Sequence, residues 1–192
     1  MIARVGIVAK AHLQAAGPHL TEIAAWLRAR DVEPVFDHDT AALAPGATDV
    51  IKADKNQLPG LVDLVLVLGG DGTLLGMADR IGQTGADIPI LGVNFGGLGF
   101  LTEVTLPELY PTLEATLKGT AQTDERMTLR AVTLRGEVPF DDRVVLNDVV
   151  LTQGTNIVRG DRLFVNLATK EGRVEGGRVQ TLITPAGGTG GQ

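Results

Sequence analysis

The first two thirds of the chain alternate between short apolar runs and amphipathic stretches. Apolar, β-branched runs are typical of strands buried on both faces of a parallel sheet, and apolar residues at three- and four-residue spacing are typical of helices. The apolar runs predict strands at residues 3–9, 33–37, 61–68 and 88–93. The amphipathic stretches predict a helix at 18–30, a glycine turn that becomes helical at 69–82, and a helix at 106–118 that Pro111 interrupts near its start. Residues 38–60 give no clear period and are predicted to form a surface connection.

The pattern changes after about residue 125, where helical periodicity does not return. Strand-like runs separated by Gly, Asp and Asn predict a small sheet of four antiparallel strands, whose exposed edges need covering. We therefore expect an α/β nucleotide-binding domain at 1–124 and a β-rich domain at 125–192. The second domain is expected to be incomplete.

Composition narrows the class of protein. The 192 residues carry a formal net charge of −6, which argues against nonspecific electrostatic binding to nucleic acid or anionic lipid. Cysteine is absent, so disulfides, thiol catalysis and zinc–thiolate sites are excluded, and the three histidines, at 12, 19 and 38, are not spaced like a metal cluster. The start MIARVGIVAK does not resemble a signal peptide, and no apolar run reaches about 18 residues, so we expect a cytoplasmic protein.

Glycine is the compositional outlier, with 25 residues, or about 13% against a usual value of roughly 7%. Gly69, Gly70, Asp71, Gly72 and Thr73 follow a predicted buried strand and open a predicted helix. Ligands of open α/β sheets bind at the carboxyl ends of strands, where glycines admit close approach and helix N-terminal N–H groups suit phosphate. Asp71 is then placed to accept a proton from an attacking hydroxyl or to help hold a metal ion. Alternatively, Asp71 is the N-cap of the following helix and the glycines form a tight turn; the pentapeptide alone does not decide between these interpretations.

Two further polar interruptions follow apolar strands. Asn94 to Phe100 form a second glycine-rich loop, and two such loops at neighbouring strand ends can make one cleft. The alternative is an Asx turn at Asn94, with the Phe100 side chain packed in the hydrophobic core. Asn147 and Asp148 interrupt a later apolar strand, on which they point to opposite faces, so that one of them can reach a cleft. The alternative there is a β-bulge or a strand end.

Three segments in this order resemble the motifs of the NAD kinase family: GGDGTLL at 69–75, GVNFGGLGFLTE at 92–103 and LNDVVL at 146–151. The first is shared with lipid kinases of the diacylglycerol kinase type and loosely with phosphofructokinases, whereas the second is much more specific to NAD kinases. The resemblance covers nearly the whole chain. It implies a Rossmann-like or phosphofructokinase-like N-terminal α/β domain followed by an all-β domain.

The resemblance implies transfer of the γ-phosphoryl group of ATP, or of polyphosphate, to the 2′-hydroxyl of the adenosine ribose of NAD, which yields NADP. Asp71 resembles the family's catalytic aspartate, which accepts the hydroxyl proton. The residues implied to bind phosphate or nucleotide are Gly69, Gly70, Gly72, Thr73, Asn94, Phe100, Asn147, Asp148, Arg159 and Thr189. Mg²⁺ with ATP is the implied cofactor and NAD the implied substrate. Members of the family commonly form dimers or tetramers, so a homo-oligomer is implied as well.

The chain departs from the family pattern near its residue 184. The family's segment Thr-Pro-Thr-Gly-Ser-Thr-Ala-Tyr is matched at Thr184, Pro185, Gly187 and Thr189, whereas the Ser, Ala and Tyr positions hold Gly188, Gly190 and Gly191. Arg178 stands where the family has an aspartate upstream. Two alternatives to an active NAD kinase therefore remain. One is a catalytically inactive nucleotide-binding module, and the other is a kinase for another hydroxyl acceptor, such as a lipid or a sugar.

Overall fold

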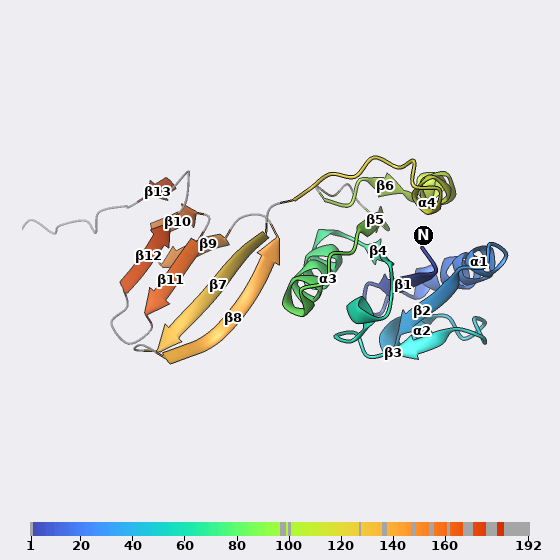
Figure 1. Ribbon diagram of the computed structural model, residues 1–192, viewed down its shortest axis with the longest axis horizontal. Coiled ribbons are helices and arrows are strands. Elements are labelled where there is room, and N and C mark those ends of the chain that lie inside the picture. The colour runs from blue at the N-terminus through green and yellow to red at the C-terminus, as the bar shows by residue number, and fades with distance from the viewer. Residues whose placement is uncertain are drawn as a thin grey trace, which may run out of the picture. The chain divides into compact units, whose positions relative to one another are not determined.

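A computed structural model of the chain describes residues 2–96, 99, 101–126, 128–135, 138–146, 149–153, 156–160, 162–166, 171–175 and 180–182 (Figure 1). The chain forms two compact units, Met1–Glu125 and Arg126–Gln192. All helices of the described residues belong to the first unit.

A six-stranded sheet forms the centre of the first unit, in the order β3-β2-β1-β4-β5-β6, and every neighbouring pair is parallel. Its strands are β1 (Arg4–Ala9), β2 (Glu33–Asp37), β3 (Ile51–Ala53), β4 (Leu64–Gly69), β5 (Ile90–Asn94) and β6 (Val104–Thr105). Every residue of the central strand β4 is buried. A strand covered on both faces needs apolar residues at successive positions, which is why its sequence is a continuous apolar run. The predicted α/β class is confirmed.

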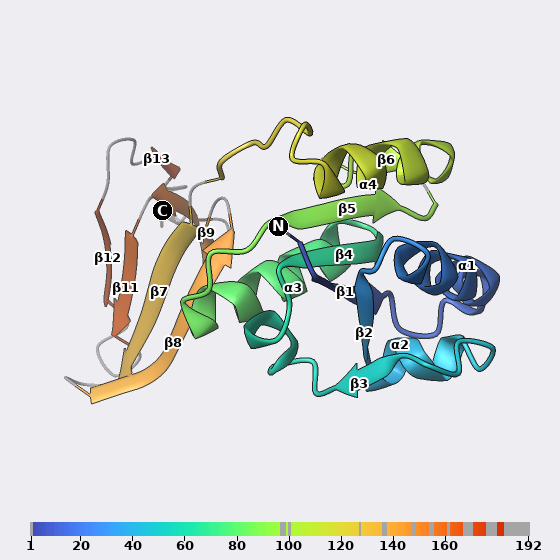
Figure 2. The same ribbon diagram turned by 45° about the vertical axis from the view of Figure 1, so that its right-hand side comes forward.

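Helices cover both faces of this sheet, with α1 and α3 on opposite sides of the strands (Figure 2). The helices are α1 (Gly17–Arg28), α2 (His38–Leu43), α3 (Asp71–Thr84) and α4 (Leu109–Leu117), with short 3-10 turns η1 (Gln14–Ala16), η2 (Leu58–Gly60) and η3 (Leu106–Glu108). Leucines of α1 and α4 share one core cluster with alternate residues of β1 and β4. On the other face, a Cβ at Gly6 of β1 would meet Leu58 of η2, and a Cβ at Gly92 of β5 would meet Leu74 of α3. Alternate residues of the same strands therefore pack into two separate layers.

Residues 38–60 do not form the predicted surface connection, because they contain α2, β3 and η2. Asp37 caps α2, since its carboxylate accepts a hydrogen bond from the N–H of Thr40 at 3.2 Å. The strand β3 extends the sheet beside β2. Both elements are too short to show a hydrophobic period, so the prediction missed them.

Pro111 does not interrupt a helix. The helix α4 begins at Leu109, so Pro111 lies in its first turn, where the N–H that proline lacks has no intrahelical partner. Residues 106–108 form the turn η3 instead, and Thr105 and Glu108 form a capping box at its start. The hydroxyl and the N–H of Thr105 both donate to the Glu108 carboxylate, at 2.6 and 3.0 Å. The hydroxyl and then the N–H of Thr105 hold the pKa of Glu108 below its ordinary value. The predicted helix 106–118 is therefore a 3-10 turn followed by a shorter α-helix.

The described part of the second unit consists of strands. These are β7 (Thr128–Arg135), β8 (Val138–Leu146), β9 (Val149–Gln153), β10 (Asn156–Gly160), β11 (Arg162–Asn166), β12 (Glu171–Glu175) and β13 (Gln180–Leu182). They form one sheet in the order β12-β11-β7-β8 and another in the order β13-β10-β9. The prediction of a single four-stranded antiparallel sheet is wrong, because there are two sheets and because β7 and β11 pair in parallel. The apolar segment 146–151 is divided between β8 and β9, which belong to different sheets.

Candidate active site

The order of strands in the parallel sheet reverses at β1. After β1 the chain adds β2 and β3 on one side, and then places β4, β5 and β6 on the other side. In open α/β sheets, ligands bind outside the carboxyl ends of the strands at such a switch point. Lys10 follows β1, Gly69 is the last residue of β4 and Asn94 is the last residue of β5. These three positions therefore share the edge at which a ligand is expected.

The two glycine-rich segments of the sequence lie side by side at this edge. Gly69 and Asn94 are partners in the ladder between β4 and β5. The N–H of Phe95 donates to the carbonyl oxygen of Gly69 at 2.9 Å, and the N–H of Lys10 donates to the carbonyl oxygen of Leu68 at 2.8 Å. Backbone hydrogen bonds thus tie the ends of β1, β4 and β5 together.

Asp71 reaches from the first glycine-rich segment to the second. It is the first residue of α3, whose N-cap is Gly70, so the interpretation of Asp71 as the N-cap of this helix is wrong. Its Oδ1 accepts hydrogen bonds from the N–H groups of Leu101 and Thr102, each at 3.1 Å, and from the Thr102 hydroxyl at 3.2 Å. A carboxylate in the first turn also interacts favourably with the helix dipole. The carboxylate is therefore held at the N-terminus of α3 by donors from a different loop.

Gly99 makes room for this contact. A Cβ at position 99 would overlap both Oδ1 of Asp71 and Oγ1 of Thr102, so a larger residue there requires one of these groups to move. The sequence interpretation assigned roles in this segment to Asn94 and Phe100 and missed Gly99 and Thr102. Their spacing carries no recognisable signal, because the need for them arises from a side chain about 30 positions earlier.

The three glycines around Asp71 differ in what surrounds them. A Cβ at Gly69 would lie 2.7 Å from Oγ1 of Thr73 and 3.2 Å from Cβ of Lys10, so the packing of the protein itself requires glycine there. A Cβ at Gly70 or at Gly72 would meet no atom within 4 Å among the described residues, apart from chain neighbours and the backbone of its own helix. The backbone of Gly70, with φ −124° and ψ −173°, is also open to any residue. The fold therefore does not require Gly70 and Gly72, whereas a phosphate approaching the N-terminus of α3 does benefit from bare backbone.

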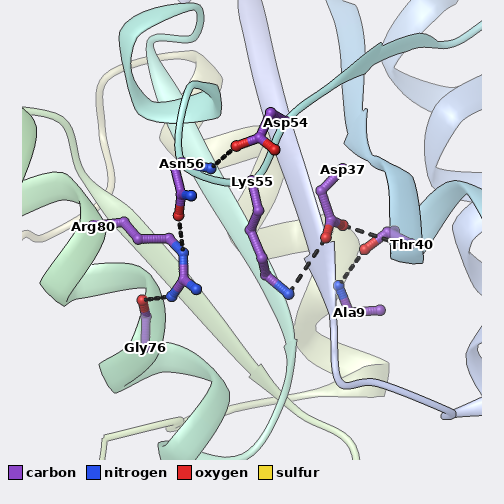
Figure 3. A network of polar contacts seen from close by, with 8 residues as sticks. All are labelled: Ala9, Asp37, Thr40, Asp54, Lys55, Asn56, Gly76 and Arg80. Carbon is purple, nitrogen blue, oxygen red and sulfur yellow. Dashed lines mark hydrogen bonds and ion pairs between the residues drawn. The ribbon is translucent and has the colours of Figure 1, made fainter.

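The other half of the carboxyl edge, at the ends of β1, β2 and β3, is occupied by a polar network of the protein (Figure 3). Asp37 is only 1% exposed, and besides capping α2 its Oδ2 lies 3.3 Å from Nζ of Lys55. The fully buried Thr40 accepts a hydrogen bond from the N–H of Ala9 at 2.8 Å through its Oγ1. In dinucleotide-binding domains an acidic residue in this region binds a ribose. Here Asp37 is committed to α2 and Lys55, so the candidate ligand positions are Lys10, just after β1, and the ends of β4 and β5.

Lys10 and His19 are two basic side chains beside the glycine-rich segments. Lys10 is exposed and makes no ion pair with any other described residue. His19 of α1 packs edge-on against Phe95, with 5.5 Å between the ring centroids. The sequence did not single out either role, because one lysine or histidine near a strand end forms no pattern. Lys10 is a cation available to an anionic ligand at the switch point.

The structure brings six of the predicted site residues to one place in the first unit. Gly69, Gly70, Asp71, Gly72, Thr73 and Asn94 lie together at the ends of β4 and β5. Arg159 belongs to β10 of the second unit, where it pairs with Val150 and Gln180. Phe100, Asn147, Asp148 and Thr189 lie outside the described residues.

Within the described residues, no group of three or more His, Cys, Asp and Glu side chains is placed to hold a metal ion. No helix in that part of the chain combines the length and the hydropathy that crossing a bilayer demands.

Comparison with known proteins places this geometry in a family. The family model described as ATP-NAD kinase N-terminal domain matches residues 5–121. The NAD kinase of Geotalea daltonii is 38% identical over 194 residues, which cover 97% of this chain and 64% of that protein. The NAD kinase of Syntrophotalea carbinolica is 43% identical over 152 residues, which cover 79% of this chain and 52% of that protein. The chain thus spans between about half and two thirds of the length of these relatives.

A solved structure shows the same fold. The crystal structure of yeast NADH kinase complexed with NADH matches with a TM-score of 0.67 at 19% sequence identity, over 83% of this chain and 56% of that chain. The resemblance inferred from the three motifs is confirmed by the family match, which includes the segments around Asp71 and Gly99. Because the family model matches residues 5–121, which are more than half of the 192 residues, the chain belongs to the ATP-NAD kinase family.

Proposed function

We propose that the protein is an NAD kinase, which transfers the γ-phosphoryl group of ATP, or a phosphoryl group of polyphosphate, to the 2′-hydroxyl of the adenosine ribose of NAD. Membership of the ATP-NAD kinase family supports the reaction class. The observation that carries the proposal is the placement of Asp71, whose carboxylate is fixed at the N-terminus of α3 between two glycine-rich segments.

Asp71 supplies the base in this proposal. The ribose oxygen attacks the terminal phosphorus, the bond from that phosphorus to the bridging oxygen breaks, and ADP or shortened polyphosphate leaves. The hydroxyl proton passes to the Asp71 carboxylate. Phosphoryl transfer needs little covalent help from the protein, so positioning and charge stabilisation account for most of the catalysis.

The phosphate side of the site is assigned to Gly70, Gly72 and Lys10. The open space above the two glycines lets donor phosphates approach the N-terminal N–H groups of α3, and the exposed Lys10 adds a positive charge. Mg²⁺ fits this site as part of the donor complex, because Mg²⁺ is commonly held by one or two carboxylates together with substrate phosphates. Bound in this way, it neutralises charge on the phosphates.

The remaining assignments rest on the family resemblance alone. Asn94, Phe100, Asn147 and Asp148 are assigned to the NAD pocket, and Thr73, Arg159 and Thr189 to phosphate or nucleotide. The same resemblance supports a homo-oligomer, a dimer or a tetramer, and the cytoplasmic location expected from the sequence is part of the proposal. The domain division at residues 1–124 and 125–192 is part of the same proposal.

An acceptor screen with the purified 192-residue chain tests the proposal. The chain is incubated with ATP or polyphosphate, Mg²⁺ and, in separate reactions, NAD, a diacylglycerol or a sugar. NADP is detected with an NADP-specific dehydrogenase, and the phosphorylated lipid or sugar is detected by mass spectrometry in the other reactions. We expect NADP to form and the lipid and the sugar to stay unmodified.

Two results would count against an NAD kinase. Phosphorylation of the lipid or the sugar in place of NAD would assign the protein to another kinase class. A folded chain that binds ATP in calorimetry and forms no NADP would be a nucleotide-binding module without catalysis.

A further inference from the structure

The Thr102 side chain lies in a space that two glycines create. A Cβ at Gly92 of β5 would approach Cγ2 of Thr102 to 3.2 Å, and a Cβ at Gly99 would overlap Oγ1 of Thr102. Thr102 is 2% exposed. It lies between the end of β5 and the N-terminus of α3, and its hydroxyl is directed at Asp71.

Three donors from two consecutive residues converge on one oxygen of Asp71. The N–H groups of Leu101 and Thr102 and the hydroxyl of Thr102 all bond to Oδ1, at 3.1, 3.1 and 3.2 Å. The two carboxylate oxygens are joined rigidly through Cγ, so donors that fix Oδ1 also fix the direction of Oδ2. Hydrogen bonds to a charged group are shorter and stronger than neutral ones.

Helix formation does not explain this contact. The N-cap of α3 is Gly70, and the helix closes its first turn through the N–H groups of Thr73 and Leu74 on the carbonyl of Gly70, at 2.9 and 3.2 Å. The Thr102 hydroxyl therefore contributes to the orientation of Asp71 and not to the start of the helix.

We propose that Thr102 is a positioning residue, which holds the Asp71 carboxylate in the rotamer needed to accept the proton of the attacking hydroxyl. The role rests on the proposed kinase function, in which Asp71 is the base. A base acts efficiently only within hydrogen-bond reach of the proton it takes, and supporting hydrogen bonds preserve that geometry. Without the Thr102 hydroxyl, the Asp71 side chain is freer to rotate about its Cα–Cβ bond.

Thr102→Val removes the hydroxyl and keeps the shape, whereas Thr102→Ser keeps the hydroxyl. We expect Thr102→Val to lower kcat about 10-fold, with little change in KM for NAD or ATP, because small misplacements of a reacting group are costly. Thr102→Ser is expected to retain most of the kcat. Thr84→Val is the matched control, since Thr84 loses a hydroxyl bond to Ile81 at the other end of α3 and its kcat should equal that of the original chain.

A double variant separates positioning from a general structural effect. In the Asp71→Asn background, Thr102→Val should cause no further loss of kcat, because its effect passes through the carboxylate. An additional loss of similar size in that background would overturn the proposal, as would an equal loss of kcat in Thr102→Ser.

A measurement on the carboxylate itself keeps the test independent of catalysis. Three-bond couplings from the backbone ¹⁵N and ¹³C′ atoms of Asp71 to its ¹³Cγ report the χ1 rotamer. We expect one rotamer in the original chain and in Thr102→Ser, and averaged couplings in Thr102→Val. Unchanged couplings in Thr102→Val would refute the positioning role. If the couplings are averaged in Thr102→Val but the original chain forms no NADP, the result would support the role of Thr102 in orienting Asp71 and contradict the kinase function.

Discussion

Gly70 and Gly99 both lie next to Asp71 and are glycine for different reasons. At Gly99 the protein leaves no room for a Cβ, because Asp71 and Thr102 already fill that space. At Gly70 the described residues leave room for a Cβ, and the backbone conformation suits any residue. Gly99 therefore belongs to the internal structure of the site, whereas Gly70 is explained by the phosphate binding that we propose there.

Gly70→Ala tests the phosphate loop. The variant should fold normally, since its Cβ would contact no described residue other than its chain neighbours, and it should weaken ATP binding about 10-fold or more, because overpacking against a ligand costs about 1–3 kcal/mol. Calorimetric titration with MgATP measures the effect. Gly60→Ala, in the turn η2 with equally open surroundings, is the control and should bind as the original chain does. Equal affinity in Gly70→Ala would remove Gly70 from the site.

Gly99→Ala tests the contact between Asp71 and the second glycine-rich segment. The added methyl overlaps Asp71 and Thr102, so we expect a loss of about 1–3 kcal/mol in the free energy of unfolding and a lower kcat. Urea denaturation and initial rates of NADP formation report the two effects. A variant as stable and as active as the original chain would show that the loop does not pack as described.

The sequence identified some residues of this site and missed others. Asp71 and its glycines are adjacent in sequence, so a strand followed by glycines and a helix identified them. The partners of Asp71 are about 30 residues away, and Thr102 is an ordinary threonine until the fold places it against the carboxylate. The N-cap alternative for Asp71 also needed coordinates, because it depends on which residue begins the helix.

At the scale of elements, the ends of β1, β2 and β3 are held by side chains that the sequence did not mark. The strand β3 and the helix α2 have 3 and 6 residues, which is too short for periodicity to show. Their places depend on long-range contacts, including pairing with β2 and the bond from Ala9 to Thr40. The longer apolar strands were predicted because burial on both faces leaves a clear pattern.

Thr40→Val tests the link between α2 and β1. The substitution removes the oxygen that accepts the N–H of Ala9 and leaves that N–H buried without this partner, at a cost of about 1–3 kcal/mol. Chemical denaturation measures the loss. Thr21→Val, which removes a hydroxyl bonded to the Gly17 carbonyl within α1, should cost less, because it leaves no donor stranded. Equal losses in the two variants would contradict this account of α2.

The start of β1 predicts a pH dependence. The Asp63 carboxylate accepts the N–H groups of Ala3 and Arg4, at 2.8 and 2.9 Å, and the bonds from Arg4 and then Ala3 lower its pKa from the ordinary value of 3.8. A carboxyl whose pKa is lower in the folded state stabilises the protein above its ordinary pKa and loses that effect as the pH falls through the lowered value.

Asp63→Ala should therefore reduce the free energy of unfolding by about 1 kcal/mol near neutral pH. The difference from the original chain should shrink as the pH falls below the ordinary pKa of 3.8. Denaturation curves recorded between neutral and acidic pH test this. A difference that stays constant across the range would mean that the ionised carboxylate contributes nothing.

At the scale of the whole molecule, the two units were predictable to different degrees. Alternating strands and helices predicted the parallel sheet of the first unit, although the strand order and the switch point at β1 came only from the structure. The second unit pairs strands far apart in sequence, including the parallel pair β7 and β11, and no local pattern encodes such partners. The polar pair in the segment 146–151 lies outside the described residues, so its role stays a prediction.

The most direct test of the central proposal compares NADP formation by the original chain and by Asp71→Asn, with NAD, ATP and Mg²⁺. Asparagine keeps the shape and an oxygen that can accept the N–H groups of Leu101 and Thr102, so the fold and ATP binding should persist. We expect the rate to fall about 10²- to 10⁴-fold, the usual effect of losing a general base. Turnover by Asp71→Asn at the rate of the original chain would contradict the assignment of Asp71 as the base.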